Sequence, residues 1–385
     1  MWKESETARH RGAGRWTCRG VVTLLAVGLV ALGGLSRVCL AGQPVTLTYA
    51  SFASADGPHA QAFKYVADEM TKRTNGRVTF RGHYSSSLVG FNEMIEALQD
   101  GRADITLFLP VQAPRSFPLS TVASVLFVTN DTWAHSQAFT DLYEIVPRFA
   151  SEWKAQRIVP LWFASIGPAV LGARTPVDNL EWLKNKSIRS TGYFTQALRV
   201  VGANPVAIPN SDVFEAIGRG VIDAFYASTI EGAALDNRHF EVTTDWRDLG
   251  AGEYTAIVTA ISQRALDKLT ADEQKMLFSI AADLRKVYYT KYYLPLMDKA
   301  CTLAMEGGLK SLKLWPKAET EKFRQVAAPV VLDRWVQDVK TAGIAAEDAK
   351  GFYDQFVKAV REKEKASPVD KTVTARCADR FAARK

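Results

Sequence analysis

Short segments of alternating and of helically spaced apolar residues follow one another from residue 45 onward. Alternation predicts a strand at 45–49, and Pro58 followed by an apolar stripe predicts a helix that ends at Asn75-Gly76. A short strand at 78–80, a second helix and a buried strand at 103–109 are expected next. The apolar face of the second helix comprises Phe91, Met94, Ile95 and Leu98. Strands that alternate with helices favour a parallel sheet in an α/β fold.

One pattern occurs twice along the chain. Residues 96–104 read E-A-L-x-x-G-x-x-D and residues 215–223 read E-A-I-x-x-G-x-x-D. At both places a predicted helix ends at a glycine, and the chain enters a strand that begins with an aspartate. We therefore expect the same supersecondary unit in two similar α/β lobes, although a pattern this short also arises by chance.

The remaining pattern completes the two lobes. Residues 256–261 predict a strand that returns to the first lobe, and Thr270 with Glu273 forms a capping box. The long helix that follows is expected to kink or end at Pro295. The expected organisation is a first lobe at 42–165 with a return segment at about 253–270, a second lobe at 166–252, bracing helices at 271–361 and a loose, charged tail at 362–385.

The first 41 residues have a different composition from the rest. Arginines precede a charge-free, mostly apolar run from Val21 to Leu35, and Cys39-Leu40-Ala41 is a small-x-small site. This pattern predicts a secretory signal peptide cleaved after Ala41, because the run of about 15 residues is short for a membrane span. An uncleaved anchor and a lipid-attached Cys39 are the less favoured alternatives.

Removal of this segment changes the charge of the protein. Residues 1–41 hold six of the 48 Lys and Arg and two of the 41 Asp and Glu, so the formal net charge falls from +7 to +3. The remaining balance does not indicate nucleic acid or a membrane surface as a partner. The two remaining cysteines, Cys301 and Cys377, form a disulfide that holds the tail or stay as unpaired thiols.

Known enzyme signatures are missing from the sequence. It contains no G-x-S-x-G, H-E-x-x-H, C-x-x-C or G-x-x-x-x-G-K-[ST] motif, and no histidines with the spacing of metal ligands. We therefore predict no catalysis, no cofactor and no metal. Ligand capture in a cleft between two lobes suits an exported protein of this kind.

Arg189 is the main candidate for ligand binding. It ends a short apolar strand, and a glycine-containing turn and a helix follow it. A guanidinium offers a planar fork of N–H donors that fits a carboxylate. A solvated arginine at a strand end, or an ion pair with an acid such as Glu181, is the alternative.

Several ordered motifs resemble one known family. The chain is similar to the solute-binding protein of tripartite ATP-independent periplasmic (TRAP) transporters, of the dicarboxylate-binding (DctP) type. The similarity covers roughly Val45 to Ala342 and implies a two-lobed periplasmic binding protein fold, type II-like, with a ligand cleft between the lobes and a long bracing helix. The matching motifs are K-x-x-R at 186–189, the runs 201–206, 210–216 and 220–223, and in the first lobe 84–88, 93–95 and 98–101.

The resemblance also assigns roles to residues. In that family the arginine of the K-x-x-R run holds the ligand carboxylate, a role that falls to Arg189. A second arginine of the family falls at about Ala169 and an asparagine at about Ala227, while Phe52 replaces a polar residue. These changes remove hydrogen-bond donors and add aromatic side chains. We therefore expect a monocarboxylate with an apolar or aromatic body rather than a sialic acid or a small dicarboxylate. The predicted ligand contacts are Arg189, Phe52, Tyr193, Asn210 and Tyr226.

Alternatives to these assignments remain. The aromatic side chains also suit ordinary core packing, and Asn210 also suits the start of a helix. The expected function is capture of an organic acid in the periplasm and its delivery to the membrane subunits of a secondary transporter, without nucleic acid and without membrane insertion after signal cleavage. A sensor subunit for a receptor kinase, a binding protein of an ATP-driven importer and an exported enzyme are the competing readings.

Overall fold

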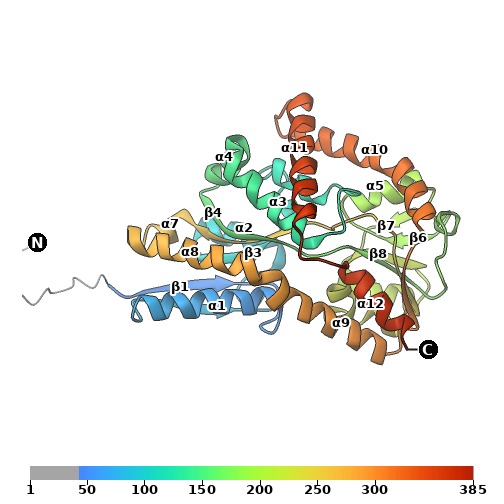
Figure 1. The fold of residues 1–385 in the computed structure, drawn as a ribbon, viewed down its shortest axis with the longest axis horizontal. Helices are drawn as coiled ribbons and strands as arrows, with labels where there is room; N and C mark the ends of the chain where they lie inside the picture. The colour runs from blue at the N-terminus through green and yellow to red at the C-terminus, as the bar shows by residue number, and fades with distance from the viewer. Residues whose placement is uncertain (1–42, 385) are drawn as a thin grey trace, which may run out of the picture. The chain divides into compact units, whose positions relative to one another are not determined.

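A computed structural model describes residues 43–384, which form two mixed sheets with helices packed on them (Figure 1). The predicted signal peptide at 1–41 lies outside the described residues. Within the described part of the chain, no helix combines the length and apolar character needed to span a membrane.

The first sheet has the strand order β2-β1-β3-β10-β4. Its strands are β1 Val45–Ala50, β2 Val78–His83, β3 Ile105–Phe108, β4 Ile158–Ser165 and β10 Ala256–Ser262. Strand β1 is parallel to β2 and β3, whereas β10 runs antiparallel to β3 and β4. The expected parallel arrangement therefore holds for the strands of this sheet except β10. The reason is that β10 does not follow a crossover helix but returns directly from a strand of the other sheet.

The second sheet has the order β11-β9-β5-β8-β6-β7. Its strands are β5 Val170–Ala173, β6 Ser187–Arg189, β7 Asn204–Val206, β8 Ala224–Ser228, β9 Asp245–Asp248 and β11 Ser311–Leu314. Strands β6, β7 and β8 are parallel, and β5 is antiparallel to β8 and β9. Strand β11 comes from the segment expected to be only helical, so the C-terminal region contributes to this sheet.

The repeated sequence pattern has the same structure in both copies. The carboxylate of Asp104 accepts the backbone N–H of Thr48 at 2.9 Å, and that of Asp223 accepts the N–H of Ser187 at 2.8 Å. The backbone N–H of each aspartate donates in return to the carbonyl of the same partner. In each copy a glycine with positive φ ends the preceding helix. The aspartate thus fixes the start of one strand against its neighbour, which confirms the predicted repeat.

The helices around the first sheet include the two that the sequence pattern predicts, α1 Pro58–Arg73 and α2 Met94–Asp100. The others are α3 Thr132–Ile145, α4 Pro147–Ala155 and α7 Gln263–Leu266. Phe91 was expected on the inner face of α2 but is 41% exposed. It lies in a 3-10 turn at Phe91–Glu93 that precedes α2, so the angular spacing of the α-helix does not apply to it.

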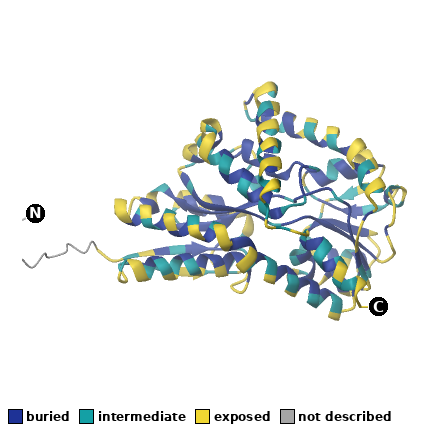
Figure 2. Cartoon of the chain, in the orientation of Figure 1, coloured by how far each residue is buried: buried dark blue, intermediate teal, exposed yellow. Residues whose placement is uncertain are grey.

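Shorter helices pack on the second sheet or lie in the connections. The α-helices among them are α5 Tyr193–Val200 and α6 Val213–Gly218. The 3-10 segments are η1 Phe91–Glu93, η2 Pro110–Gln112, η3 Leu119–Ser124, η4 Leu180–Leu183, η5 Asn210–Asp212 and η7 His239–Glu241, and the π segments are η6 Gly232–Asp236 and η8 Tyr289–Tyr293. The strands are largely buried and the outer helix faces exposed (Figure 2).

A nearly continuous helical segment follows the first sheet. The capping box of Thr270 and Glu273 opens α8 Ala271–Tyr288, as predicted. A π turn, η8, links it to α9 Leu294–Glu306. Pro295 does not end the helical path: it lies in the first turn of α9, directly after the π turn, and a local irregularity of this kind accommodates a proline within a helical segment.

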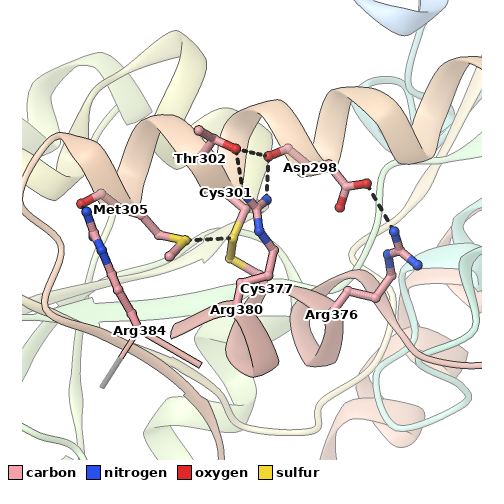
Figure 3. The surroundings of a disulfide bond; sticks show 8 residues. All are labelled: Asp298, Cys301, Thr302, Met305, Arg376, Cys377, Arg380 and Arg384. Carbon is pink, nitrogen blue, oxygen red and sulfur yellow. Dashed lines mark hydrogen bonds and ion pairs between the residues drawn. A yellow bond between two sulfur atoms is a disulfide. The ribbon is translucent and has the colours of Figure 1, made fainter. Parts of the chain in front are cut away.

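The C-terminal region is mostly helical from residue 317 to residue 382. It comprises α10 Lys317–Thr341, α11 Ala346–Lys365 and α12 Val373–Ala382. The tail is therefore not loose from residue 362 onward. Cys301 on α9 and Cys377 on α12 form a disulfide, and Arg376 pairs with Asp298 at 3.0 Å beside it (Figure 3). These contacts hold α12 against α9.

Two connections cross between the sheets side by side. The chain passes from β4 to β5 through residues 166–169 and from β9 to β10 through residues 249–255. Pro168 and Glu253 form an antiparallel bridge, and the backbone N–H of Tyr254 donates to the carbonyl of Gly167 at 3.0 Å. A pair of short crossing segments of this kind is the usual form of a hinge.

Candidate functional site

Arg189 lies at the carboxyl end of β6, where the parallel strands β6, β7 and β8 end together. Its side chain is only 5% exposed. The Nε–H donates to the carbonyl of Ile208 at 3.1 Å, and Nη1 donates to the carbonyls of Ala227 at 2.8 Å and Tyr226 at 3.3 Å. Three backbone carbonyls from the ends of neighbouring strands therefore fix the guanidinium.

The charge of Arg189 has no carboxylate partner among residues 43–384. Its Nη2 group has no hydrogen-bond partner in this part of the chain either. Glu181, the alternative partner, is exposed and pairs with Lys184 at 2.8 Å. Burial lowers the pKa of Arg189, and the nearby phenol of Tyr254 acts in the opposite direction. Because a buried cation without an anion is unfavourable, this arrangement favours an external carboxylate.

Asn210 lies close to the carboxyl ends of the strands that position Arg189. It begins η5, and its Nδ2 lies 3.5 Å from the hydroxyl of Ser228 at the end of β8. Its Oδ1 is buried and has no partner in the described residues. The amide thus has an unused acceptor near the ends of the strands that hold Arg189, and its contact with a ligand stays a prediction.

The side chain of His239 forms a hydrogen bond with the backbone of Asn210. Its Nε2 lies 3.2 Å from the carbonyl of Asn210, so Nε2 carries the proton and donates. The ring is fully buried, and burial lowers the pKa of His239 to about 4. A neutral imidazole therefore stands beside the Arg189 site, and the carboxylate remains the complementary charge that the site lacks.

Tyr226 and Tyr193 are both buried and make contacts within the protein. Tyr226 is fully buried, its ring lies edge-on to Phe194 at 4.7 Å, and its carbonyl rather than its ring touches Arg189. The hydroxyl of Tyr193 donates to Asp338 of α10 at 3.2 Å. Both rings belong to the core in this structure, and their contact with a ligand stays a prediction.

Phe52 lies on the first sheet, whereas the other four predicted residues belong to the second. It follows β1 and is partly buried. Its ring is edge-on to the exposed ring of Phe91 at a centroid distance of 4.7 Å. The two rings form an apolar surface after β1, and a role for Phe52 in ligand binding stays a prediction.

Two residues near Arg189 were missed by sequence reasoning. The hydroxyls of Thr191 and Tyr254 lie 2.9 Å apart, and Thr191 follows Arg189 by two residues. The Gly-x-Gly sequence at 250–252 before Tyr254 is a signal for a sharp connection, but nothing in it points to Arg189. The contact depends on the tertiary fold.

A surface hollow of about 680 Å³ lies elsewhere, at the junction of η4, the end of α5 and α10. Leu180, Val200 and Val326 form its apolar part, and charged side chains such as Lys184 and Lys322 lie around it. None of the predicted ligand contacts lines it. Within the described residues, no group of three acidic, histidine or cysteine side chains is placed to hold a metal ion.

Comparison with known proteins gives consistent matches. Residues 49–338 match the family described as bacterial extracellular solute-binding protein, family 7. The 2,3-diketo-L-gulonate-binding periplasmic protein YiaO of Escherichia coli K12 is 24% identical over 317 residues, which cover 82% of this chain and 93% of that protein.

Two solved structures show the same fold. A TRAP solute binding protein from Rhodoferax ferrireducens T118, in complex with copurified benzoate, has a TM-score of 0.69 at 21% identity and covers 84% of this chain and 99% of its own. A marine metagenome TRAP solute binding protein specific for aromatic acid ligands, in complex with metahydroxyphenylacetate, has a TM-score of 0.72 at 19% identity, with 83% and 99% covered. The predicted two-lobed fold is thereby confirmed.

Proposed function

Because the chain belongs to the bacterial extracellular solute-binding protein family 7, we propose that it captures a monocarboxylic acid with an apolar or aromatic body. Arg189 holds the carboxylate. Membrane subunits of a TRAP transporter receive the acid in the periplasm, where the chain arrives after cleavage of its signal peptide at about Ala41. The protein binds its ligand without transforming it.

One observation carries the proposal for the ligand. Arg189 is 5% exposed and fixed by three carbonyls, yet it keeps an uncommitted Nη2 group and has no carboxylate partner among the described residues. A ligand carboxylate completes both the hydrogen bonding and the charge of this guanidinium. The bound acids of two structural relatives, benzoate and metahydroxyphenylacetate, are aromatic monocarboxylates and support the same class here.

We infer that the two lobes are residues 42–165 with 253–270, and residues 166–252, with the C-terminal helices braced on both. The crossing segments at 166–169 and 249–255 act as the hinge between them. Phe52 comes from the first lobe, and Arg189 and Asn210 from the second. A ligand held between them favours a closed arrangement of the lobes.

Calorimetric titration with a panel of benzoate, 3-hydroxybenzoate and phenylacetate tests the proposal. We expect saturable binding by the wild type, a loss of affinity on the order of a hundredfold for Arg189→Met and a smaller loss for Arg189→Lys. Arg199→Ala on the exposed end of α5 is the matched control and should bind like the wild type. Circular dichroism establishes that each variant is folded. Unchanged affinity in folded Arg189→Met would refute the proposed anchor.

A further inference from the structure

Tyr254 links the carboxylate site to the connection that crosses between the sheets. Its backbone N–H donates to the carbonyl of Gly167 on the neighbouring crossing segment at 3.0 Å. Its ring lies 5.6 Å from that of Phe194, which also contacts Tyr226, whose carbonyl accepts from Arg189. The phenol is close enough to influence the pKa of Arg189. Tyr254 therefore belongs both to the hinge and to the surroundings of the guanidinium.

The hydroxyls of Tyr254 and Thr191 leave one hydrogen available. They lie 2.9 Å apart, so one of the two O–H groups donates to the other oxygen. Neither hydroxyl has another hydrogen-bond partner among the described residues. The second O–H hydrogen of the pair is therefore uncommitted, as are the N–H groups on Nη2 of Arg189.

We propose that the linked hydroxyls of Tyr254 and Thr191 form the second half of the carboxylate site. One carboxylate oxygen of the ligand binds Nη2 of Arg189, and the other accepts the uncommitted O–H hydrogen of the pair. The inference rests on the proposed function, because it requires a carboxylate at Arg189. It makes the hydroxyl pair a determinant of ligand specificity.

The charge of the site explains the expected selectivity. Ala169, at the position of the second arginine in the resembling family, is 3% exposed and provides no donor. A hydroxyl pair adds hydrogen bonding without adding positive charge, so one ligand carboxylate neutralises the charge of the one guanidinium. A second carboxylate on the ligand would enter the site without a cation, which is unfavourable in a largely buried place.

Tyr254→Phe removes the phenol oxygen and keeps the ring, so the fold is retained. Titration with the same panel of acids should show affinity weaker on the order of tenfold, with no change in the melting temperature of the ligand-free protein beyond about 2 °C. Thr191→Val should weaken binding as well, because it removes the hydroxyl. Thr191→Ser should bind like the wild type, because it keeps the hydroxyl. Tyr353→Phe on α11 is the matched control and should bind like the wild type.

The outcomes separate this inference from the proposed function. Wild-type affinity in Tyr254→Phe, together with a loss in Arg189→Met, overturns the hydroxyl pair and leaves Arg189 as the anchor. Equal losses in Thr191→Val and Thr191→Ser point to a packing role and also overturn it. If the wild type binds none of the acids, the proposed function and this inference both fail.

Discussion

The guanidinium Nη1 of Arg189 lies 2.8 Å from the carbonyl of Ala227, a residue held at a φ of 62°. A left-handed alanine is uncommon, because its Cβ crowds the backbone at a cost of about 1–2 kcal/mol. At this position the turn of the backbone at the end of β8 directs the carbonyl toward the guanidinium. Ala227 therefore has a strained backbone and also supplies a carbonyl that positions the proposed anchor, Arg189.

Substitutions at Ala227 should reveal this strain. Ala227→Gly should leave the free energy of unfolding within about 1 kcal/mol of the wild type, because relief of the left-handed penalty offsets the greater freedom of glycine in the unfolded chain. Ala227→Val should lose about 2 kcal/mol or more, since a β-branched residue fits neither this φ nor a site that is 2% exposed. Urea unfolding measures both, and a neutral Ala227→Val would contradict the argument.

The repeated pattern was predictable because its residue types recur at the same short spacing along the sequence. A glycine after the helix and an aspartate before the strand leave a recognisable spacing, and Asp104 and Asp223 do bind the neighbouring strand in the same way. Helix α12 was not predictable in this manner. Its buried positions are few, namely Val373, Thr374 and Cys377, and it is held by a disulfide and by a bond from Thr374 to Asp248 on β9.

The candidate site was only partly visible in the sequence. Arg189 could be named because its residue type and its place at a strand end point to a carboxylate. Tyr254 could not, since its partner Thr191 lies 63 positions away and the two meet only through the fold. The carbonyl of Ala227 was equally hidden, because alanine carries no signal for a positive φ.

Burial of Glu253 at the crossing segments should make stability depend on pH. Glu253 is 3% exposed, and the hydroxyl of Thr132 donates to its Oε1 at 2.7 Å. Burial raises the pKa of Glu253 from 4.5 to about 8, although the bond from Thr132 acts in the opposite direction. Between these values the folded protein binds more protons than the unfolded chain. Stability is therefore greatest below about pH 4.5 for this group and falls as the pH rises to about 8.

Glu253→Gln keeps the size of the side chain and removes its titration. Over this pH range, the unfolding free energy of the variant should fall less steeply than that of the wild type, by up to about 1.4 kcal/mol per pH unit. Urea unfolding at about pH 5 to 8 measures the two slopes. Glu152 and Glu231, whose pKa burial also raises to about 8, contribute equally to both proteins. Parallel slopes would show that Glu253 ionises normally.

The disulfide between Cys301 and Cys377 should stabilise the protein substantially. It joins two residues that are 76 positions apart in the sequence. Closing a loop of this length lowers the conformational entropy of the unfolded chain, which stabilises the folded protein by about 2–5 kcal/mol. The double variant Cys301→Ala, Cys377→Ala should lose this amount in urea unfolding. A reductant should lower the stability of the wild type to a similar level and leave the variant unchanged. Equal stability of the oxidised wild type and the variant would contradict the prediction.

Gly167 and Tyr293 should show strong energetic coupling. Gly167 has a φ of 96°, and a Cβ at this position would overlap the hydroxyl oxygen of Tyr293 but lie 3.5 Å from its ring carbon Cζ. Gly167→Ala therefore introduces both a strained backbone and a clash, and should cost about 2–4 kcal/mol in unfolding free energy. Tyr293→Phe removes only the atom that clashes.

A double-mutant cycle separates the two effects. In the Tyr293→Phe background, Gly167→Ala should cost only the backbone penalty of about 1–2 kcal/mol, because the nearest remaining ring atom is at an ordinary contact distance. Urea unfolding of the four proteins gives the coupling energy as the difference between the two costs. Because Gly167 also accepts the N–H of Tyr254, the same substitution should weaken benzoate binding. If Gly167→Ala costs the same in both backgrounds, backbone strain alone explains the glycine and the hydroxyl of Tyr293 does not restrict the hinge.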